Sequence, residues 1–258
     1  MAGRLQDKIA VITGAGRGIG AATARRFVEE GAKVAIAELD PHSGEAMAAQ
    51  LHAEGYQALA VQTNVANQES VRQMVKTVVE ELGPPDILVN NAGINVFYDP
   101  LQLKDEDWQR CLAINLEGMW FCCRAVLPHM LDKGRGAIVN MASAHSFQII
   151  PQCFPYPVAK HGVIGLTRAL AIEYAARNIR VNAVCPGYIE TQIALDYWNT
   201  FPDPEKERQY AYNLHPPKRI GTVDEVAWPI VFLASDEAGF VNGAALMVDG
   251  GRSVLYHD

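Results

Sequence analysis

Three residues between positions 143 and 160 have the side-chain types and spacing of a proton-transfer site. Tyr156 and Lys160 are four residues apart, so on a helix the ammonium would lie beside the phenol. A free phenol has a pKa of about 10, and lowering it to about 7 requires roughly 4 kcal/mol, which Lys160 and a second positive charge could supply together. Ser143 is expected at the end of the preceding strand, where its hydroxyl would bind the same substrate oxygen. The alternative is a packed ring beside a solvated lysine, and the rest of the chain must decide between the two.

The composition is that of a globular protein with small-molecule or protein ligands. The chain has 258 residues, of which 49% are hydrophobic and 20% charged, and its net charge is -7 without Lys or Arg runs. These values exclude a disordered chain and argue against a nucleic-acid or anionic-membrane surface. The five cysteines have neither Cys-x-x-Cys nor metal spacing, so we expect reduced thiols and no metal site. No apolar signal region or membrane-length run occurs, so the cytoplasm is the expected location.

Short β-branched runs alternate with helical patterns along the chain, without a low-complexity linker or an internal repeat. This alternation predicts an α/β fold in which helices cover both faces of a parallel sheet. The expected strands are residues 9–13, 33–38, 57–62, 87–90, 137–141, 180–185 and 245–248. The expected helices are residues 18–30, 43–54, 68–81, 105–131, 156–177 and 223–234.

A glycine-rich turn from Gly14 to Gly20 follows the first predicted strand and opens an alanine-rich helix. Glycines let the backbone turn sharply and approach a pyrophosphate, and the helix N-terminus presents free N–H groups to it. A plain tight turn would need the same residues. The position between a strand and a helix near the N-terminus favours a dinucleotide site.

Glu38 ends the second predicted strand and bears on the choice of cofactor. Its carboxylate can accept hydrogen bonds from the adenosine ribose hydroxyls of NAD and would repel the extra phosphate of NADP. Arg17 acts in the opposite direction, because a guanidinium in the glycine turn could pair with that phosphate. The repulsion between a 2′-phosphate and Glu38 should raise the free energy of NADP binding by more than the attraction to Arg17 lowers it. We therefore predict NAD, with NADP as the alternative and a solvated carboxylate as the non-functional interpretation of Glu38.

Together these motifs resemble the short-chain dehydrogenase/reductase family from end to end. The resemblance is carried by the glycine turn, Asn90-Asn91-Ala92-Gly93, Asn115, Ser143, Tyr156-Pro157-Val158-Ala159-Lys160, Pro186-Gly187 and Val248-Asp249-Gly250-Gly251. It implies a Rossmann-like, doubly wound parallel sheet of about seven strands, a nicotinamide cofactor and a homotetramer. Pro157 beside the tyrosine departs from the family pattern, but proline is tolerated in a first helical turn.

The resemblance also implies a role for each matching residue. Tyr156 is similar to the catalytic acid/base, Lys160 to the residue that lowers its pKa and holds the nicotinamide ribose, and Ser143 to the one that polarises the substrate oxygen. Asn115 is similar to a residue that kinks its helix and fixes a proton-relay water. Asn64 replaces an aspartate of the family at the adenine. The residues assigned to the cofactor are Gly14, Arg17, Gly18, Ile19, Gly20, Glu38, Asn64, Val65, Asn91, Ala92, Gly93, Tyr156, Lys160, Pro186, Gly187, Ile189 and Thr191.

Residues 188–219 are expected to form a substrate lid on a single dinucleotide-binding and catalytic domain, residues 1–258. Aromatic rings alternate there with hydrogen-bonding groups, which suits a polyhydroxylated ligand better than a steroid or fatty-acyl chain. Residues 197–205 also resemble a segment of some sugar dehydrogenases of the family. The residues assigned to the substrate are Asn95, His145, Gln152, Tyr188 and Trp198, although many polar groups here could be ordinary surface or subunit contacts.

Three functions compete on this evidence. The first is an NAD-dependent dehydrogenase of a sugar, polyol or sugar acid. The second is a carbonyl reductase, such as a 3-oxoacyl thioester reductase; Glu38 argues against it because NADPH usually drives such reductions. The third is a cofactor-binding regulator without catalysis, against which the complete set of Asn115, Ser143, Tyr156 and Lys160 argues.

The C-terminal segment from Arg252 to Asp258 carries apolar and aromatic residues that a free tail would have little reason to carry. We expect it to pack against a neighbouring subunit and to bring Arg252 or Tyr256 near that subunit's lid. A frayed, solvated end is the alternative.

Overall fold

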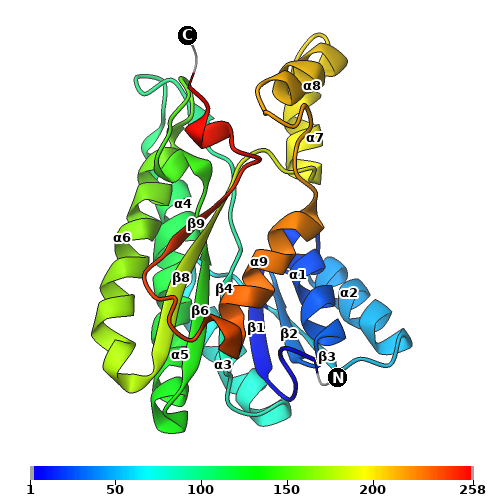
Figure 1. Cartoon of the computed structure of the whole chain (residues 1–258), viewed down its shortest axis with the longest axis vertical. Coiled ribbons are helices and arrows are strands. Elements are labelled where there is room, and N and C mark those ends of the chain that lie inside the picture. The colour runs from blue at the N-terminus through cyan, green and yellow to red at the C-terminus, as the bar shows by residue number, and fades with distance from the viewer. Residues whose placement is uncertain (1–2, 257–258) are drawn as a thin grey trace.

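Seven parallel strands form the centre of the molecule (Figure 1), described here from a computed structural model that covers residues 3–256. Their order is β3-β2-β1-β4-β6-β8-β9, so the chain builds outward from β1 in both directions. This confirms the predicted Rossmann-like sheet, and the reversal between β1 and β4 creates the crevice where such sheets bind ligands. The strands are β1 (Ile9–Thr13), β2 (Lys33–Glu38), β3 (Ala58–Gln62), β4 (Ile87–Asn90), β6 (Gly136–Met141), β8 (Ile179–Pro186) and β9 (Ala245–Val248).

Apolar side chains on both faces explain why these segments become central strands. All five residues of β1 are buried, and they alternate between two cores: Ile12 packs in the same cluster as Phe27, whereas Val11 packs in the same cluster as Val78. A strand that is buried on both sides requires a helical layer on each face of the sheet.

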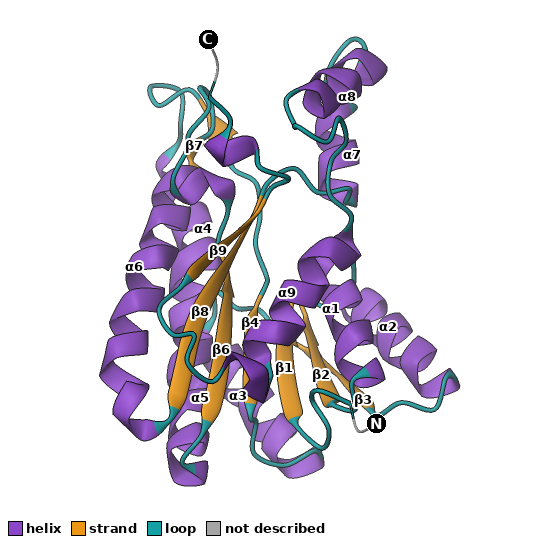
Figure 2. Cartoon of the chain, in the orientation of Figure 1, coloured by secondary structure: helices purple, strands orange, loops and turns teal. Residues whose placement is uncertain are grey.

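Helices supply those two layers (Figure 2). The first core is closed by α1 (Gly18–Glu29), α2 (Pro41–Ala53) and α9 (Val223–Ala234). The second is closed by α3 (Gln68–Glu81), α5 (Gly118–Lys133) and α6 (Tyr156–Tyr174). The helix predicted for residues 105–131 is present, but it consists of α4 (Asp105–Leu112), a π-helical turn at Ala113–Glu117, and α5.

Two short helices occupy the predicted lid, where the sequence interpretation expected loops. They are α7 (Gln192–Trp198) and α8 (Pro204–Asn213), and Figure 1 shows them projecting beyond the carboxyl ends of the strands. Asp203 caps α8 by accepting a hydrogen bond from the Lys206 N–H at 3.1 Å, and Pro204 occupies the first helical position. This Asp-Pro pair is a helix-start signal that the sequence reading did not use.

A second, two-stranded sheet lies beside the start of α6. Its strands β5 (Phe97–Tyr98) and β7 (Phe154–Pro155) are antiparallel, and Phe97 pairs with Pro155. This pairing connects the loop after β4 to the residue that precedes Tyr156. Two residues per strand are too few to leave a periodic signal in the sequence.

Three further observations concern the described residues. The five cysteines are buried and free. Between residues 3 and 256, no group of three or more His, Cys, Asp or Glu side chains is placed to hold a metal ion. No helix in the same range is both long enough and apolar enough to span a bilayer.

Candidate active site

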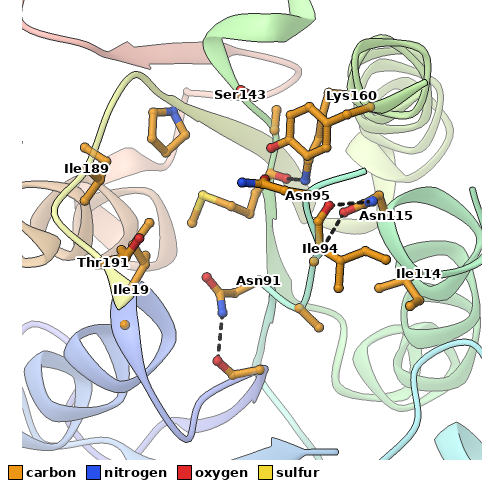
Figure 3. A pocket seen from close by; sticks show the side chains of 18 of the residues that line it. Ile19, Asn91, Ile94, Asn95, Ile114, Asn115, Ser143, Lys160, Ile189 and Thr191 are labelled. Atoms are coloured by element: carbon orange, nitrogen blue, oxygen red, sulfur yellow. Dashed lines mark hydrogen bonds between the residues drawn. The ribbon is translucent and has the colours of Figure 1, made fainter. Parts of the chain in front are cut away.

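One cavity of about 410 Å³ opens at the carboxyl ends of the strands, a volume typical of small-molecule sites. It extends from the end of β2 to the start of α6, and Figure 3 shows its interior. The structure brings together on its wall every residue assigned to catalysis and every residue assigned to the cofactor except Gly20. Of the substrate candidates, Asn95, His145 and Tyr188 line it.

The glycine turn forms one end of the cavity because two of its glycines adopt left-handed backbone conformations. Gly14 has φ 62° and Gly18 has φ 58°, values that side chains disfavour. Gly20 is a helical residue that plays a packing role instead: a Cβ there would lie 2.2 Å from the Gly14 carbonyl oxygen. Gly20 thus packs beneath the turn and does not line the cavity.

Asn91 holds this turn in place from β4. Its side-chain N–H group donates to the carbonyl oxygens of Thr13 and Gly14, both at 2.9 Å, and Figure 3 draws one of these bonds as a dashed line below Asn91. The backbone N–H groups at the start of α1 face the cavity without side-chain caps, because Arg17 makes no capping hydrogen bond. The combination of a Cβ-free turn, open N–H groups and a helix N-terminus fits a dinucleotide pyrophosphate.

Glu38 lies at the mouth of the same end of the cavity. Its carboxylate accepts hydrogen bonds from Gly16 N–H at 3.0 Å and Leu39 N–H at 2.9 Å. The Asn64 side-chain oxygen, expected at the adenine, accepts from Ala66 N–H at 3.0 Å. It keeps one lone pair for a ligand, so the exchange of aspartate for asparagine leaves an acceptor in place.

Tyr156 is the first residue of α6, between Pro155 and Pro157, and its hydroxyl is desolvated by the surrounding walls. Burial raises the pKa of Tyr156 to about 12, although the Ser143 hydroxyl opposes the shift. The sequence expectation of a lowered pKa therefore does not hold for the protein side chains alone. A second positive charge beside Lys160 is the other part of that expectation, and a bound oxidised nicotinamide would supply it.

Lys160 lies one helical turn further, with its ammonium nitrogen 5.5 Å from the centre of the Tyr156 ring. The ammonium donates to the Met141 carbonyl oxygen at 2.7 Å, and burial lowers the pKa of Lys160 to about 8. Ser143 follows β6, and its hydroxyl oxygen accepts from His145 N–H at 3.1 Å. The Ser143 hydroxyl also hydrogen-bonds the Tyr156 phenol, so both hydroxyls lie at the same point of the cavity wall.

Asn115 occupies the π-helical turn, which agrees with the expected kink. Its side chain accepts from Ile94 N–H and donates to the Ile94 carbonyl oxygen, each at 3.0 Å (Figure 3). A Cβ on Gly93 would lie 2.9 Å from the Asn115 side-chain oxygen and 3.8 Å from the Lys160 nitrogen. Glycine at position 93 therefore lets the amide and the ammonium face the same wall of the cavity.

Two of the substrate candidates, Gln152 and Trp198, do not line the cavity. Trp198 is only 3% exposed and packs with Ala211 and Ile220 inside the lid, because α7 turns this ring toward α8. Gln152 lies exposed in a left-handed turn with φ 63° and does not line the cavity.

The sequence interpretation also missed Phe97, which lines the cavity from β5. Its ring contacts Tyr156 edge to face at 5.5 Å between centroids, and Tyr197 of the lid at 6.0 Å. Phe97 thus connects the lid to the catalytic tyrosine. No local pattern identified it, since it belongs to a two-residue strand.

The C-terminal segment contacts its own chain, because the Gln148 side chain donates to the Ser253 carbonyl oxygen; its contact with a neighbouring subunit stays a prediction. Arg252 begins a 3-10 turn (Arg252–Val254) and lines the cavity. Tyr256 is 86% exposed. His257 and Asp258, the last residues of the predicted interface segment, lie outside the described residues.

Known proteins match this chain over nearly its whole length. A family model described as enoyl-(acyl carrier protein) reductase matches residues 14–253. D-threitol dehydrogenase of Mycolicibacterium smegmatis is 39% identical over 251 residues, which cover 97% of this chain and 95% of that protein. The 3-oxoacyl-(acyl-carrier-protein) reductase FabG of Thermotoga maritima is 38% identical over 248 residues, covering 96% and 98%.

A solved structure agrees with these matches. The ligand-free aldohexose dehydrogenase of Thermoplasma acidophilum has a TM-score of 0.91 at 34% identity and covers 100% of this chain and 98% of its own. The matched region includes the glycine turn, the helix of Tyr156 and Lys160, and the closing strand β9. The chain therefore belongs to the short-chain dehydrogenase/reductase family, the nicotinamide-dependent oxidoreductases of alcohol and carbonyl substrates.

Proposed function

We propose that this protein oxidises a hydroxyl group of a polar substrate, a sugar, polyol or sugar acid, with NAD. The observation that carries the proposal is a single continuous cavity in which Glu38 lines one end and Tyr156, Ser143 and Lys160 line the other. Asn95, Tyr188 and Gln192 add hydrogen-bonding groups to the wall. Such groups suit a ligand whose hydroxyls each need a partner when they leave water.

Tyr156 takes the hydroxyl proton of the substrate in this mechanism, and Ser143 donates a hydrogen bond to the same oxygen. The residues of the glycine turn, with Glu38, Ile189 and Thr191, would hold NAD, which would supply the two-electron chemistry as the acceptor of the hydride from the carbinol C–H bond. Lys160 stabilises the phenolate, and Asn115 holds the wall through which a water could return the proton to solvent. The C–H and O–H bonds break, a carbonyl forms, and the proton stays on Tyr156 until it is relayed.

A screen with purified protein tests the proposal directly. Absorbance at the nicotinamide band would be followed with sugars, polyols, sugar acids and hydroxy acids, each with NAD and with NADP. Oxidation of at least one polar alcohol with NAD is the expected result. Activity confined to reduction of 3-oxoacyl thioesters with NADPH would favour the alternative function, a carbonyl reductase. The sequence identity to the Thermotoga maritima reductase supports that alternative.

The preference for NAD is expected to depend on the charge of Glu38. Glu38→Ala removes the negative charge that would face a 2′-phosphate, so the ratio of kcat/KM for NAD to that for NADP should fall roughly tenfold or more. Glu38→Gln is the matched control, because it removes the charge but retains one side-chain oxygen that can accept from either the Gly16 or the Leu39 N–H group. Wild-type protein that prefers NADP would refute the role of Glu38.

A further inference from the structure

Arg252 is brought to the cavity by a sharply turned segment after β9. Gly250 and Gly251 have φ values of 63° and 82°, which reverse the chain, and the 3-10 turn that begins at Arg252 follows immediately (Figure 1). The buried Asp249 fixes the reversal by accepting from Gly251 N–H at 3.0 Å and from Ser253 N–H at 2.7 Å. Position 252 is thus held by backbone hydrogen bonds and is not a loose end.

A second contact comes from the loop after β6. The Gln148 side-chain amide donates to the Ser253 carbonyl oxygen. This loop also carries Ser143 and His145, both on the cavity wall. The segment of Arg252 is therefore attached to the same loop that presents the catalytic serine.

The guanidinium of Arg252 stacks on an aromatic wall of the cavity. Its central carbon lies 5.5 Å from the centre of the Tyr188 ring. Such stacking orients the guanidinium plane while its N–H edges stay available for an oxyanion. Burial lowers the pKa of His145, and the positive charge of Arg252 lowers it further. The centre of the His145 ring lies 5.9 Å from that of Tyr156. The positive charge is therefore felt next to the reacting end.

Among residues 3–256, no carboxylate lines this end of the cavity; besides burial, the charge of Glu207 helps to raise the pKa of Tyr188, but Glu207 is not on the cavity wall. Among the described residues, Glu38 is the only acid that lines the cavity, and its carboxylate is bound to N–H groups at the dinucleotide end. Within residues 3–256, Arg252 makes no ion pair. Asp249 lies three residues before Arg252 in the chain, and its carboxylate oxygens accept hydrogen bonds from backbone N–H groups. A half-buried guanidinium without a counter-charge is costly unless a ligand supplies one.

We propose that Arg252 binds a carboxylate of the substrate, so that the substrate is a hydroxy acid, such as a sugar acid, and not a neutral sugar or polyol. This inference rests on the proposed function, and it selects one substrate class among those named there. A guanidinium matches a carboxylate through two parallel N–H···O bonds, which would fix the acid group relative to Tyr156. Tyr188 would hold the guanidinium plane in that orientation.

The first experiment compares hydroxy acids with their neutral carboxamides in wild-type protein, using aldonic acids and short hydroxycarboxylic acids with NAD. The acid should have a kcat/KM roughly 10- to 100-fold above that of its amide, the size of a charge-assisted hydrogen-bonded pair. Arg252→Met should remove this difference by lowering kcat/KM for the acid while leaving that for the amide nearly unchanged. Arg252→Lys should retain part of it.

Arg208→Met is the matched control variant. Arg208 stacks on Trp198 at 5.7 Å, much as Arg252 stacks on Tyr188, but it does not line the cavity. The control should therefore leave the ratio of acid to amide unchanged. Binding of NADH, followed by fluorescence, shows whether each variant is folded, and the wild-type comparison decides the question even if Arg252→Met does not fold.

The outcomes separate this inference from the proposed function. Neutral polyols oxidised as well as acids, or an equal loss for acid and amide in Arg252→Met, would overturn the role of Arg252 and leave the dehydrogenase intact. A preference for phosphorylated sugars over carboxylates would overturn it as well. If no alcohol of any class reduced NAD or NADP, the proposed function itself would fail.

Discussion

Replacing Tyr156 by phenylalanine is expected to lower turnover by about 10² to 10⁴, the loss that follows removal of a general acid or base. The phenol is the one group in our mechanism that exchanges the substrate proton, and the ring itself would remain in place against Phe97. The measurement is kcat for alcohol oxidation with NAD. NADH binding by fluorescence should stay near the wild-type level, because the variant keeps every other wall of the cavity.

The pH profile provides a second, independent readout of the same residue. Oxidation requires the ionised phenol, and burial holds the pKa of Tyr156 at about 12 in the protein without its ligands. The oxidation rate of the wild type should therefore rise with pH above neutrality, as the phenolate becomes more populated. Tyr156→Phe should lose this rise. A variant that retained a tenth of wild-type turnover with the same pH profile would show that another group moves the proton.

Lys160→Met is expected to lower kcat at pH 7 by about a hundredfold. At the 5.5 Å separation of the ammonium from the Tyr156 ring, a unit charge is worth about 3 kcal/mol at an effective dielectric constant of about 20. That energy favours the phenolate, so its loss reduces the reactive form by roughly two orders of magnitude. Methionine has a similar length, and it removes a buried charge that makes no ion pair within residues 3–256. Thermal stability should therefore be kept.

The difference between the wild type and Lys160→Met should shrink as pH rises. Burial lowers the pKa of Lys160 to about 8, so the wild-type ammonium is charged below that pH and is progressively lost above it. Measuring kcat for both proteins from pH 6.5 to 9.5 would reveal this convergence. A constant ratio across the range would mean that Lys160 acts by position and not by charge.

The fold could be predicted because its signals are local and strong. The continuous apolar run of β1 and the adjoining glycine turn identify a buried parallel strand followed by a helix, and the structure agrees. The lid helices were missed since α7 is short and its start at Thr191 lacks an apolar periodicity. The capping residues Thr191 and Asp203 are the sequence features from which the starts of the two helices could have been predicted.

The site could be predicted where its residues lie close together in sequence or belong to a motif of the family that the chain resembles. Tyr156 and Lys160 share a helix, and Ser143 follows a strand end, so their proximity follows from local geometry. The burial of Trp198 could not be predicted, because the direction of a ring on α7 depends on its packing against α8. The position of Arg252 on the cavity wall of its own chain could not be predicted either, since it depends on the backbone angles of Gly250 and Gly251.

Because Asn115 lies in the π-helical turn at Ala113–Glu117, the geometry of the active site depends on the number of residues between α4 and α5. Such a turn contains one residue more than regular α-helix would need over the same distance. Deleting a single residue there would restore a regular helix, so the wide turn that carries Asn115 would be lost. Asn115 would then leave Ile94, although no catalytic side chain had been substituted. Insertions and deletions are usually tolerated in loops. In this chain, the loss of one residue in the middle of a helix would displace Asn115 and so impair proton transfer.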